Sequence, residues 1–141
     1  MRLAIFDTES DGLLDVATTI HCAAVKDIET GNRKSFTPKD INHLTKYLSS
    51  FDVLIGHNVI GHDFPLIRKI YGWEFRGTVV DTLLMSRLQR PNRTYPKDAP
   101  KNSGPHSVQT WGYRVGRGKV EHEDWTTFTP AVIVTGKQQY L

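Results

Sequence analysis

The stretch that decides the fold is residues 3–10, LAIFDTES, almost at the start of the chain. Its four leading apolar residues predict a short buried strand. Asp7 and Glu9 follow directly, and residues two apart on an extended backbone point to the same side, so this strand is expected to present two carboxylates together. A divalent cation is the simplest means of holding such a pair. The alternative is a strand that ends in an ordinary acidic turn.

The composition is that of one ordinary domain with a mildly basic charge. The chain has 141 residues, 38% of them hydrophobic, so we expect a single domain over residues 1–141 with a real core. The net charge of +3 permits a nucleic-acid partner without requiring one. The single cysteine, Cys22, excludes an intrachain disulfide and suits a reducing compartment. No apolar stretch reaches the length of a membrane span, so a cytoplasmic location is expected.

Further elements follow from hydrophobic spacing and turn residues. Residues 18–28 are rich in β-forming types and predict a second strand, and a turn signal at residues 30–32 predicts a hairpin to a third strand at residues 34–37. Residues 40–50 carry apolar side chains at helical spacing. Residues 51–55 then form another short apolar run, which predicts a fourth strand.

A second informative stretch is residues 56–67, GHNVIGHDFPLI, where the fourth strand gives way to polar residues and then to a helix. Asp63 falls in the first helical turn, where the helix dipole favours a carboxylate, so it is either a simple helix-start residue or a functional one. Pro65 is compatible with a first turn. His57 and Asn58 follow the strand end, and Asn58 could satisfy backbone groups of the loop. The chain shows no His or Cys spacing typical of zinc.

The third stretch, residues 78–88, predicts a short strand followed by a helix. Asp81 or Thr82 is expected to cap that helix, and a catalytic role for Asp81 is the less favoured alternative. Residues 87–119 then contain eight Lys and Arg against one acid, Asp98, and prolines mark residues 89–105 as a long open loop. A solvated loop and a loop that contacts phosphates are equally compatible with this composition.

After this loop, residues 106–115 predict a short helix. Its aromatic residues Trp111 and Tyr113 are expected in the core rather than as platforms for stacking bases. The remaining residues, 126–141, form an atypical tail that is rich in threonine and β-branched residues.

In this order the motifs resemble the DnaQ-like (DEDD) 3′–5′ exonuclease domain. The closest likeness is to the N-terminal proofreading domain of family A DNA polymerases from short-tailed bacteriophages, and it runs over about residues 1–130. It rests on the three stretches described above and on residues 106–116, HSVQTWGYRVG. The resemblance implies an α/β, ribonuclease H-like fold, with a mixed five-stranded sheet flanked by helices.

The resemblance also implies a chemistry. Asp7 would bridge two divalent ions, Mg²⁺ or Mn²⁺, and Glu9 and Asp63 would complete their shells for hydrolysis of the 3′ end of single-stranded DNA. The residues expected to contact the nucleic acid are Thr8, His57, Asn58, Arg87, Arg90 and Arg93. The implied partners are single-stranded DNA 3′ ends and a DNA polymerase domain or other replication protein, and the implied location is the cytoplasm of a bacterial host.

The chain departs from the family pattern in its third motif, a C-terminal helix that bears a fourth carboxylate with a Tyr or His shortly before it. No Asp or Glu follows Asp124, so this helix is expected to be truncated or altered. Loss of a metal ligand together with a water-orienting residue predicts a large loss of rate. Three interpretations follow: an active exonuclease with its last ligand supplied elsewhere, a catalytically inactive DNA-binding or polymerase-associated module, and a structural protein that folds poorly.

Overall fold

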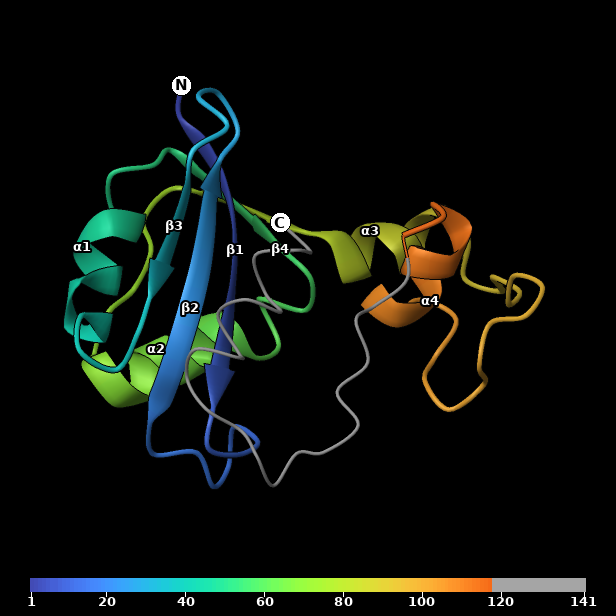
Figure 1. The fold of residues 1–141 in the computed structure, drawn as a ribbon, viewed down its shortest axis with the longest axis horizontal. Helices are drawn as coiled ribbons and strands as arrows, with labels where there is room; N and C mark the ends of the chain where they lie inside the picture. Colours follow the sequence, from blue (N-terminus) through green and yellow to red (C-terminus); the bar gives the residue numbers. More distant parts are fainter. Residues whose placement is uncertain (118–141) are drawn as a thin grey trace.

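The sheet is built outward from a central strand, β1 (Leu3–Ser10), in the computed structural model, which describes residues 1–117 (Figure 1). The strand order is β3-β2-β1-β4-β5. β1 pairs antiparallel with β2 (Ile20–Asp27), which pairs antiparallel with β3 (Arg33–Phe36). On its other side β1 pairs parallel with β4 (Val53–Gly56), which pairs parallel with β5 (Thr78–Asp81). This mixed five-stranded sheet confirms the fold class predicted from the sequence.

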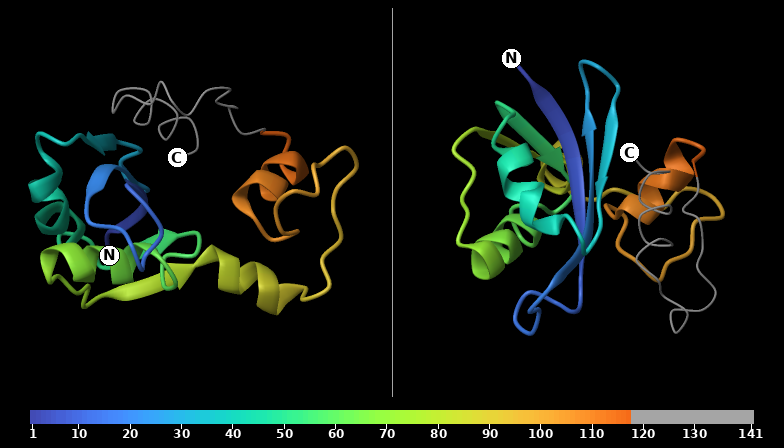
Figure 2. Two further views of the ribbon diagram at one scale, coloured as in Figure 1. Left: turned by 90° about the horizontal axis from the view of Figure 1, so that it is seen from below. Right: turned by 60° about the vertical axis from the view of Figure 1, so that its left-hand side comes forward.

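The helices lie on both sides of this sheet. A 3₁₀ turn (Ile41–His43) and α1 (Leu44–Leu48) follow β3, and α2 (Asp63–Tyr71) follows β4. Figure 2 shows α1 and α2 on one side of the sheet. α3 (Thr82–Gln89) continues from the end of β5 away from the sheet, and α4 (Val108–Arg114) packs against it, so that the two form an arm on the other side. We call this pair, with the loop that joins it, the α3–α4 arm.

The core fills the space between the sheet and the α1–α2 layer. Along β1, Ala4, Phe6 and Thr8 are buried, whereas the residues between them are half-buried and face the other side. Phe6 meets Phe64 edge-on, with ring centroids 5.3 Å apart. The other large core side chains, each worth about 1.5–3 kcal/mol on burial, are Ile20, Val25, Phe36, Leu44, Leu48, Phe51, Leu54, Val59, Leu66 and Ile67. This alternation turns the odd-numbered residues of β1, including Asp7 and Glu9, away from the core.

β1 extends beyond the apolar run that predicts it. The strand continues through Glu9 to Ser10 because its polar half pairs with β2, with Asp7 opposite Ala24 and Glu9 opposite Cys22. The carboxylates therefore lie on regular strand rather than on the turn after it. The predicted helix over residues 40–50 is present but starts as a 3₁₀ turn and ends at Leu48.

One expectation about the arm is wrong. Tyr113 is 39% exposed and Trp111 is half-buried against α3, so neither joins the core, which lies on the other side of the sheet. The loop before α4 has no regular secondary structure, and the hydroxyl of Tyr95 donates to the carbonyl of Ser103 (2.8 Å) across it. The predicted helix at residues 106–115 is observed as α4. The expectations for the tail, residues 126–141, lie outside the described residues.

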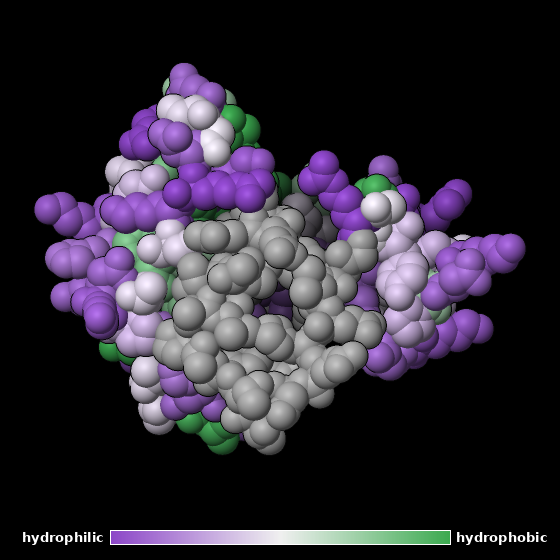
Figure 3. All heavy atoms as spheres, in the orientation of Figure 1, coloured by the Kyte–Doolittle hydropathy of each residue, from purple (hydrophilic) through white to green (hydrophobic). Residues whose placement is uncertain are grey.

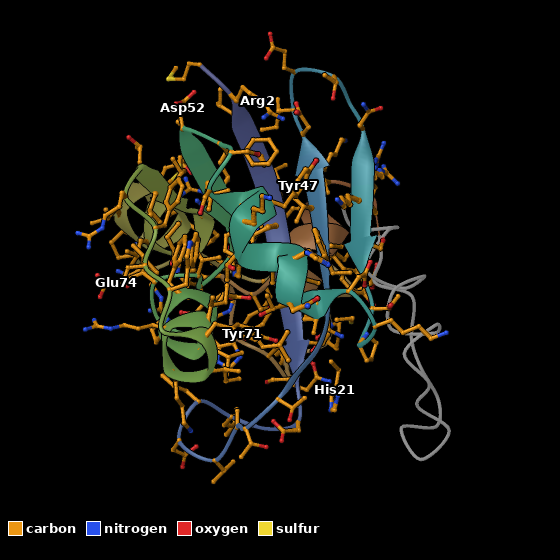
Figure 4. All side chains as sticks on the ribbon, turned by 90° about the vertical axis from the view of Figure 1, so that its left-hand side faces the viewer. Arg2, His21, Tyr47, Asp52, Tyr71 and Glu74 are labelled. Carbon is orange, nitrogen blue, oxygen red and sulfur yellow. The ribbon has the colours of Figure 1, made fainter. Side chains whose placement is uncertain are left out.

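The two ends of β1 differ in character. At the start of the strand, the backbone N–H of Arg2 donates to Asp52 (2.6 Å) and the Arg2 guanidinium pairs with Asp27 (2.9 Å). In Figure 4, Arg2 and Asp52 lie together at one end of the sheet and His21 at the other.

Hydrophilic residues dominate the visible surface on either side of the grey region in Figure 3. No helix within residues 1–117 combines the length and apolar character needed to cross a bilayer.

Candidate active site

The first contact of the site joins α2 to β1. Asp63 starts α2 and is 3% exposed, and its Oδ1 accepts hydrogen bonds from the backbone N–H of Thr8 (3.0 Å) and from the Thr8 hydroxyl (2.5 Å). Pairing between β1 and β4 ends at Ile5, opposite Ile55, so α2 rather than β4 meets β1 at Thr8. Asp63 therefore does more than start a helix, because it ties that helix to the acidic half of β1.

The same backbone N–H brings a second carboxylate into place. Oδ1 of Asp7 lies 3.1 Å from the Thr8 nitrogen, which is also 3.0 Å from Oδ1 of Asp63. The two carboxylate oxygens therefore cannot be farther apart than about twice a hydrogen-bond length. The structure thus brings together Asp7 and Asp63, two residues that the sequence separates by more than fifty positions.

Glu9 lies on the same face of β1 as Asp7, two residues farther along, and is half-buried as Asp7 is. Within residues 1–117, however, no three His, Cys, Asp or Glu side chains converge closely enough to hold a metal ion. The donors are all carboxylate oxygens, the type that Mg²⁺ and Mn²⁺ prefer, and Mg²⁺ is commonly bound by one or two carboxylates with water and substrate phosphates. The donor chemistry of Asp7 and Asp63 fits such an ion.

Asp81 has a structural task. It is 5% exposed and accepts backbone N–H bonds from Leu83 (2.9 Å) and Leu84 (3.4 Å), which confirms it as the cap of α3. The same carboxylate also accepts the N–H groups of Asn58 and Ile60, each at 3.0 Å. These four bonds occupy the carboxylate, so the structure gives no support to the catalytic alternative.

The second task of Asp81 is invisible in the sequence, because it depends on the register that sets Gly56 opposite Asp81 on the neighbouring strand. The Asp81 carboxylate, rather than the side chain of Asn58, thus satisfies backbone N–H groups of this loop. Asn58 itself is exposed and has a left-handed backbone, with φ of 63°, and its N–H group donates to Asp81.

His57 lies at the same end of the sheet as the carboxylates. It follows β4, is half-buried, and its Nδ1 lies 2.9 Å from the hydroxyl of Thr82. Burial lowers the pKa of His57 below its usual 6.5, although the nearby carboxylates of Asp81 and Asp7 act in the opposite direction. The ring is therefore mainly neutral at pH 7 and is close enough to Asp7 to feel its charge.

The predicted DNA-contacting residues are divided between two places. Thr8 is buried beneath the two carboxylates, and His57 and Asn58 lie at the end of β4. Arg87 and Arg90 are exposed at the end of α3, and Arg93 lies over the ring of Trp111 in the arm. Sequence reasoning missed Arg114, which lies over the same ring, and the only signal for it was its place in a basic segment.

Similar proteins were found by sequence. The chain is 28% identical over 144 residues to the DNA-directed DNA polymerase of Escherichia phage T7, and equally so to that of Enterobacteria phage T3. Each match covers 86% of this chain and 20% of the polymerase, so the chain spans about a fifth of the length of these curated relatives. No protein-family model matches the chain.

Solved structures share the fold. The family B DNA polymerase of the archaeon Pyrobaculum calidifontis gives a TM-score of 0.64 at 16% identity, covering 99% of this chain and 22% of that chain. Escherichia coli exonuclease I in complex with a dT13 oligonucleotide gives 0.59 at 12% identity, covering 98% and 40%. The zinc-bound complex of exonuclease I with single-stranded DNA gives 0.54 at 14% identity, covering 99% and 40%.

These likenesses agree with the sheet order and with the resemblance seen in the motifs. The chain has the DnaQ-like exonuclease fold and is a distant relative of the N-terminal region of the T7 and T3 phage DNA polymerases.

Proposed function

We propose that this chain is a 3′–5′ exonuclease-type domain that acts on the 3′ ends of single-stranded DNA. The observation that carries the proposal is the pair of carboxylates, Asp7 and Asp63, that meet at the N–H of Thr8. The phage relatives are DNA polymerases and the structural relative exonuclease I is known in complex with single-stranded DNA, which supports the same substrate class. A polymerase domain, in the same or in another chain, is the proposed partner.

In this proposal Asp7 and Asp63, which meet at the N–H of Thr8, would hold Mg²⁺ or Mn²⁺, and Glu9, on the same face of β1 as Asp7, would join them when the ion is bound. Divalent ions bound by carboxylates can activate a water and stabilise the leaving oxygen in phosphodiester hydrolysis. Thr8 positions the site, because its N–H and hydroxyl fix the carboxylate of Asp63 while the same N–H orients Asp7. In this proposal the neutral His57 ring, whose Nδ1 lies beside the hydroxyl of Thr82, and the exposed Asn58 would contact the terminal nucleotide.

A second candidate function is a DNA-binding or polymerase-associated module without turnover. It is favoured by the finding that no three potential ligands converge in the part of the chain that the structure describes. The basic α3–α4 arm supports it as well, since cationic residues supply most of the affinity of non-specific binding to nucleic acids. It predicts binding of single-stranded DNA that weakens steeply as the salt concentration rises.

The test is digestion of a 5′-labelled single-stranded oligonucleotide with Mg²⁺ or Mn²⁺. The exonuclease proposal predicts products that shorten stepwise from the 3′ end, and it predicts that Asp7→Asn and Asp63→Asn lower the rate at least about 100-fold. Glu29→Gln is the matched control, because Glu29 is an exposed acid in the turn after β2, at the end of that strand that lies away from Glu9.

Each result decides between the two functions. Stepwise digestion by the Glu29→Gln variant and not by Asp7→Asn supports the exonuclease. Digestion that survives Asp7→Asn and Asp63→Asn contradicts the assigned site. No digestion by any form, with salt-sensitive binding retained, overturns the exonuclease in favour of the binding module.

A further inference from the structure

Two arginines of the α3–α4 arm share one aromatic ring. The guanidinium carbon of Arg93, from the loop after α3, lies 4.7 Å from the centroid of Trp111, and that of Arg114, in α4, lies 5.0 Å from it. Cation–π contacts of this kind orient the flat guanidinium groups and hold them in place. We call Arg93, Trp111 and Arg114 the arginine–tryptophan cluster.

The ring that carries these arginines is itself fixed. Nε1 of Trp111 donates to the hydroxyl of Ser86 on α3 (3.0 Å), and the same hydroxyl lies 2.8 Å from Nδ1 of His106. Ser86 is 4% exposed and His106 is 9% exposed, so this contact is sheltered from water. The indole is therefore a preorganised platform rather than a loose surface side chain.

The charges of the cluster are not balanced by any acid among residues 1–117. Nη2 of Arg93 donates to the side-chain oxygen of Gln89 (2.9 Å), and Nη2 of Arg114 donates to the carbonyl of Thr94 (2.7 Å); both acceptors are neutral. No carboxylate within residues 1–117 forms an ion pair with either guanidinium. Burial, and secondarily the charge of Arg93, lowers the pKa of Arg114.

Two guanidinium nitrogens are also buried without an acceptor. Among the described residues, nothing accepts a hydrogen bond from Nε of Arg93 or from Nη1 of Arg114. Buried donors of this kind cost free energy, and so does the repulsion between two cations held on one ring. An anion bound by both guanidiniums would offset that repulsion.

We propose that Arg93 and Arg114, held on Trp111, form a binding site for the phosphodiester groups of single-stranded DNA. Guanidinium groups bind phosphate through paired hydrogen bonds, which suits arginine rather than lysine at such a site. The site deepens the proposed function and rests on it, because it would hold the strand whose 3′ end reaches Asp7 and Asp63.

The cluster is connected to the acidic end of the sheet through a short chain of contacts. Ser86 of α3 contacts His106, and the backbone of His106 interacts with the ring of His57. His57 in turn is close enough to Asp7 for the two to interact electrostatically. A DNA strand held at the arginine–tryptophan cluster is therefore bound to the α3–α4 arm, which contacts the candidate site through His106 and His57.

The test measures binding of the full chain to a fluorescent dT oligonucleotide by anisotropy, in EDTA so that no cleavage occurs. We expect Arg93→Gln and Arg114→Gln each to raise the Kd about 10-fold at low salt and to reduce the salt slope by about one. Arg76→Gln is the matched control, because Arg76 is an exposed arginine in the segment between α2 and β5. Arg93→Lys and Arg114→Lys keep the charge and are expected to recover only part of the affinity.

The outcomes separate this proposal from the nuclease. Weaker binding by Arg93→Gln and Arg114→Gln, with Arg76→Gln unchanged and thermal unfolding preserved, supports the cluster whether or not the chain digests DNA. Equal affinity of all three variants overturns it, even if digestion depends on Asp7. Two competitors of the labelled oligonucleotide test the ligand. If poly-glutamate displaces the oligonucleotide as well as unlabelled DNA does, the site is not specific for phosphodiester groups. If a mononucleotide displaces it at the same concentration of phosphate as unlabelled DNA, the site binds free phosphates rather than a DNA strand.

Discussion

The carboxylate of Asp63 lies 3.0 Å from the backbone nitrogen of Thr8 and 2.5 Å from its hydroxyl, although 55 positions separate the two residues in the chain. This contact fixes the start of α2 against the central strand. It also determines which atoms surround the candidate site, because the same N–H is shared with Asp7.

Removal of the Thr8 hydroxyl tests this contact. Thr8→Val keeps the shape but leaves the buried carboxylate of Asp63 with one hydrogen bond fewer, so we expect a loss of about 1–3 kcal/mol in the free energy of unfolding. Urea denaturation measures it, with Thr30→Val at an exposed turn as the control. A loss no greater than that of the control would contradict the structural role of this contact.

Asp81 provides a second test, because its carboxylate accepts four backbone N–H groups. Asp81→Ala removes the cap of α3 and leaves the backbone N–H groups of Asn58 and Ile60 without an acceptor. We therefore expect the free energy of unfolding to fall by about 3 kcal/mol. Asp81→Asn keeps one acceptor oxygen and is expected to cost less. Equal stability of both variants and the unchanged chain in urea would show that these bonds do not hold the loop.

Stability is expected to fall as the pH drops, through His57. Its pKa in the folded chain lies below 6.5, mainly because of burial. Above that pH both folded and unfolded states are neutral at this position; below it the unfolded state binds a proton that the folded state resists, so folding weakens. Urea denaturation at about pH 7.5 and about pH 5.5 should show a smaller drop for His57→Gln than for the unchanged chain. The same drop in both would exclude this histidine as the cause.

The loop between β1 and β2 has its own anchor in Asp11. The hydroxyl of Thr18, followed by the N–H groups of Thr19 and Thr18, holds the pKa of Asp11 well below its usual range. This contribution is present at neutral pH and is lost as acid protonates the carboxylate. Asp11→Asn should speed hydrogen exchange at the amides of Thr18 and Thr19, measured by NMR. Unchanged exchange there, with Asp15→Asn as the control, would remove Asp11 as the anchor.

The sequence predicted the local elements well because each carries its own periodicity. The strands, the hairpin and the caps follow from alternation, turn residues and side chains that suit a helix start, as with Asp81 before α3. The mixed sheet followed from the resemblance of the ordered motifs, and the structure confirms it. The length of β1 was underestimated because its polar half is held by pairing with β2, which is not a local property.

The sequence by itself determined that Asp7 and Glu9 share one face of an extended segment and that Asp63 lies in the first turn of a helix, since those positions depend only on neighbouring residues. Only the tertiary structure decided that Asp7 and Asp63 share one N–H, because that requires α2 to meet β1 where β4 no longer does. Only the tertiary structure, likewise, set Arg93 and Arg114 on Trp111. Contacts between distant segments depend on strand register and helix packing, and no local pattern encodes them.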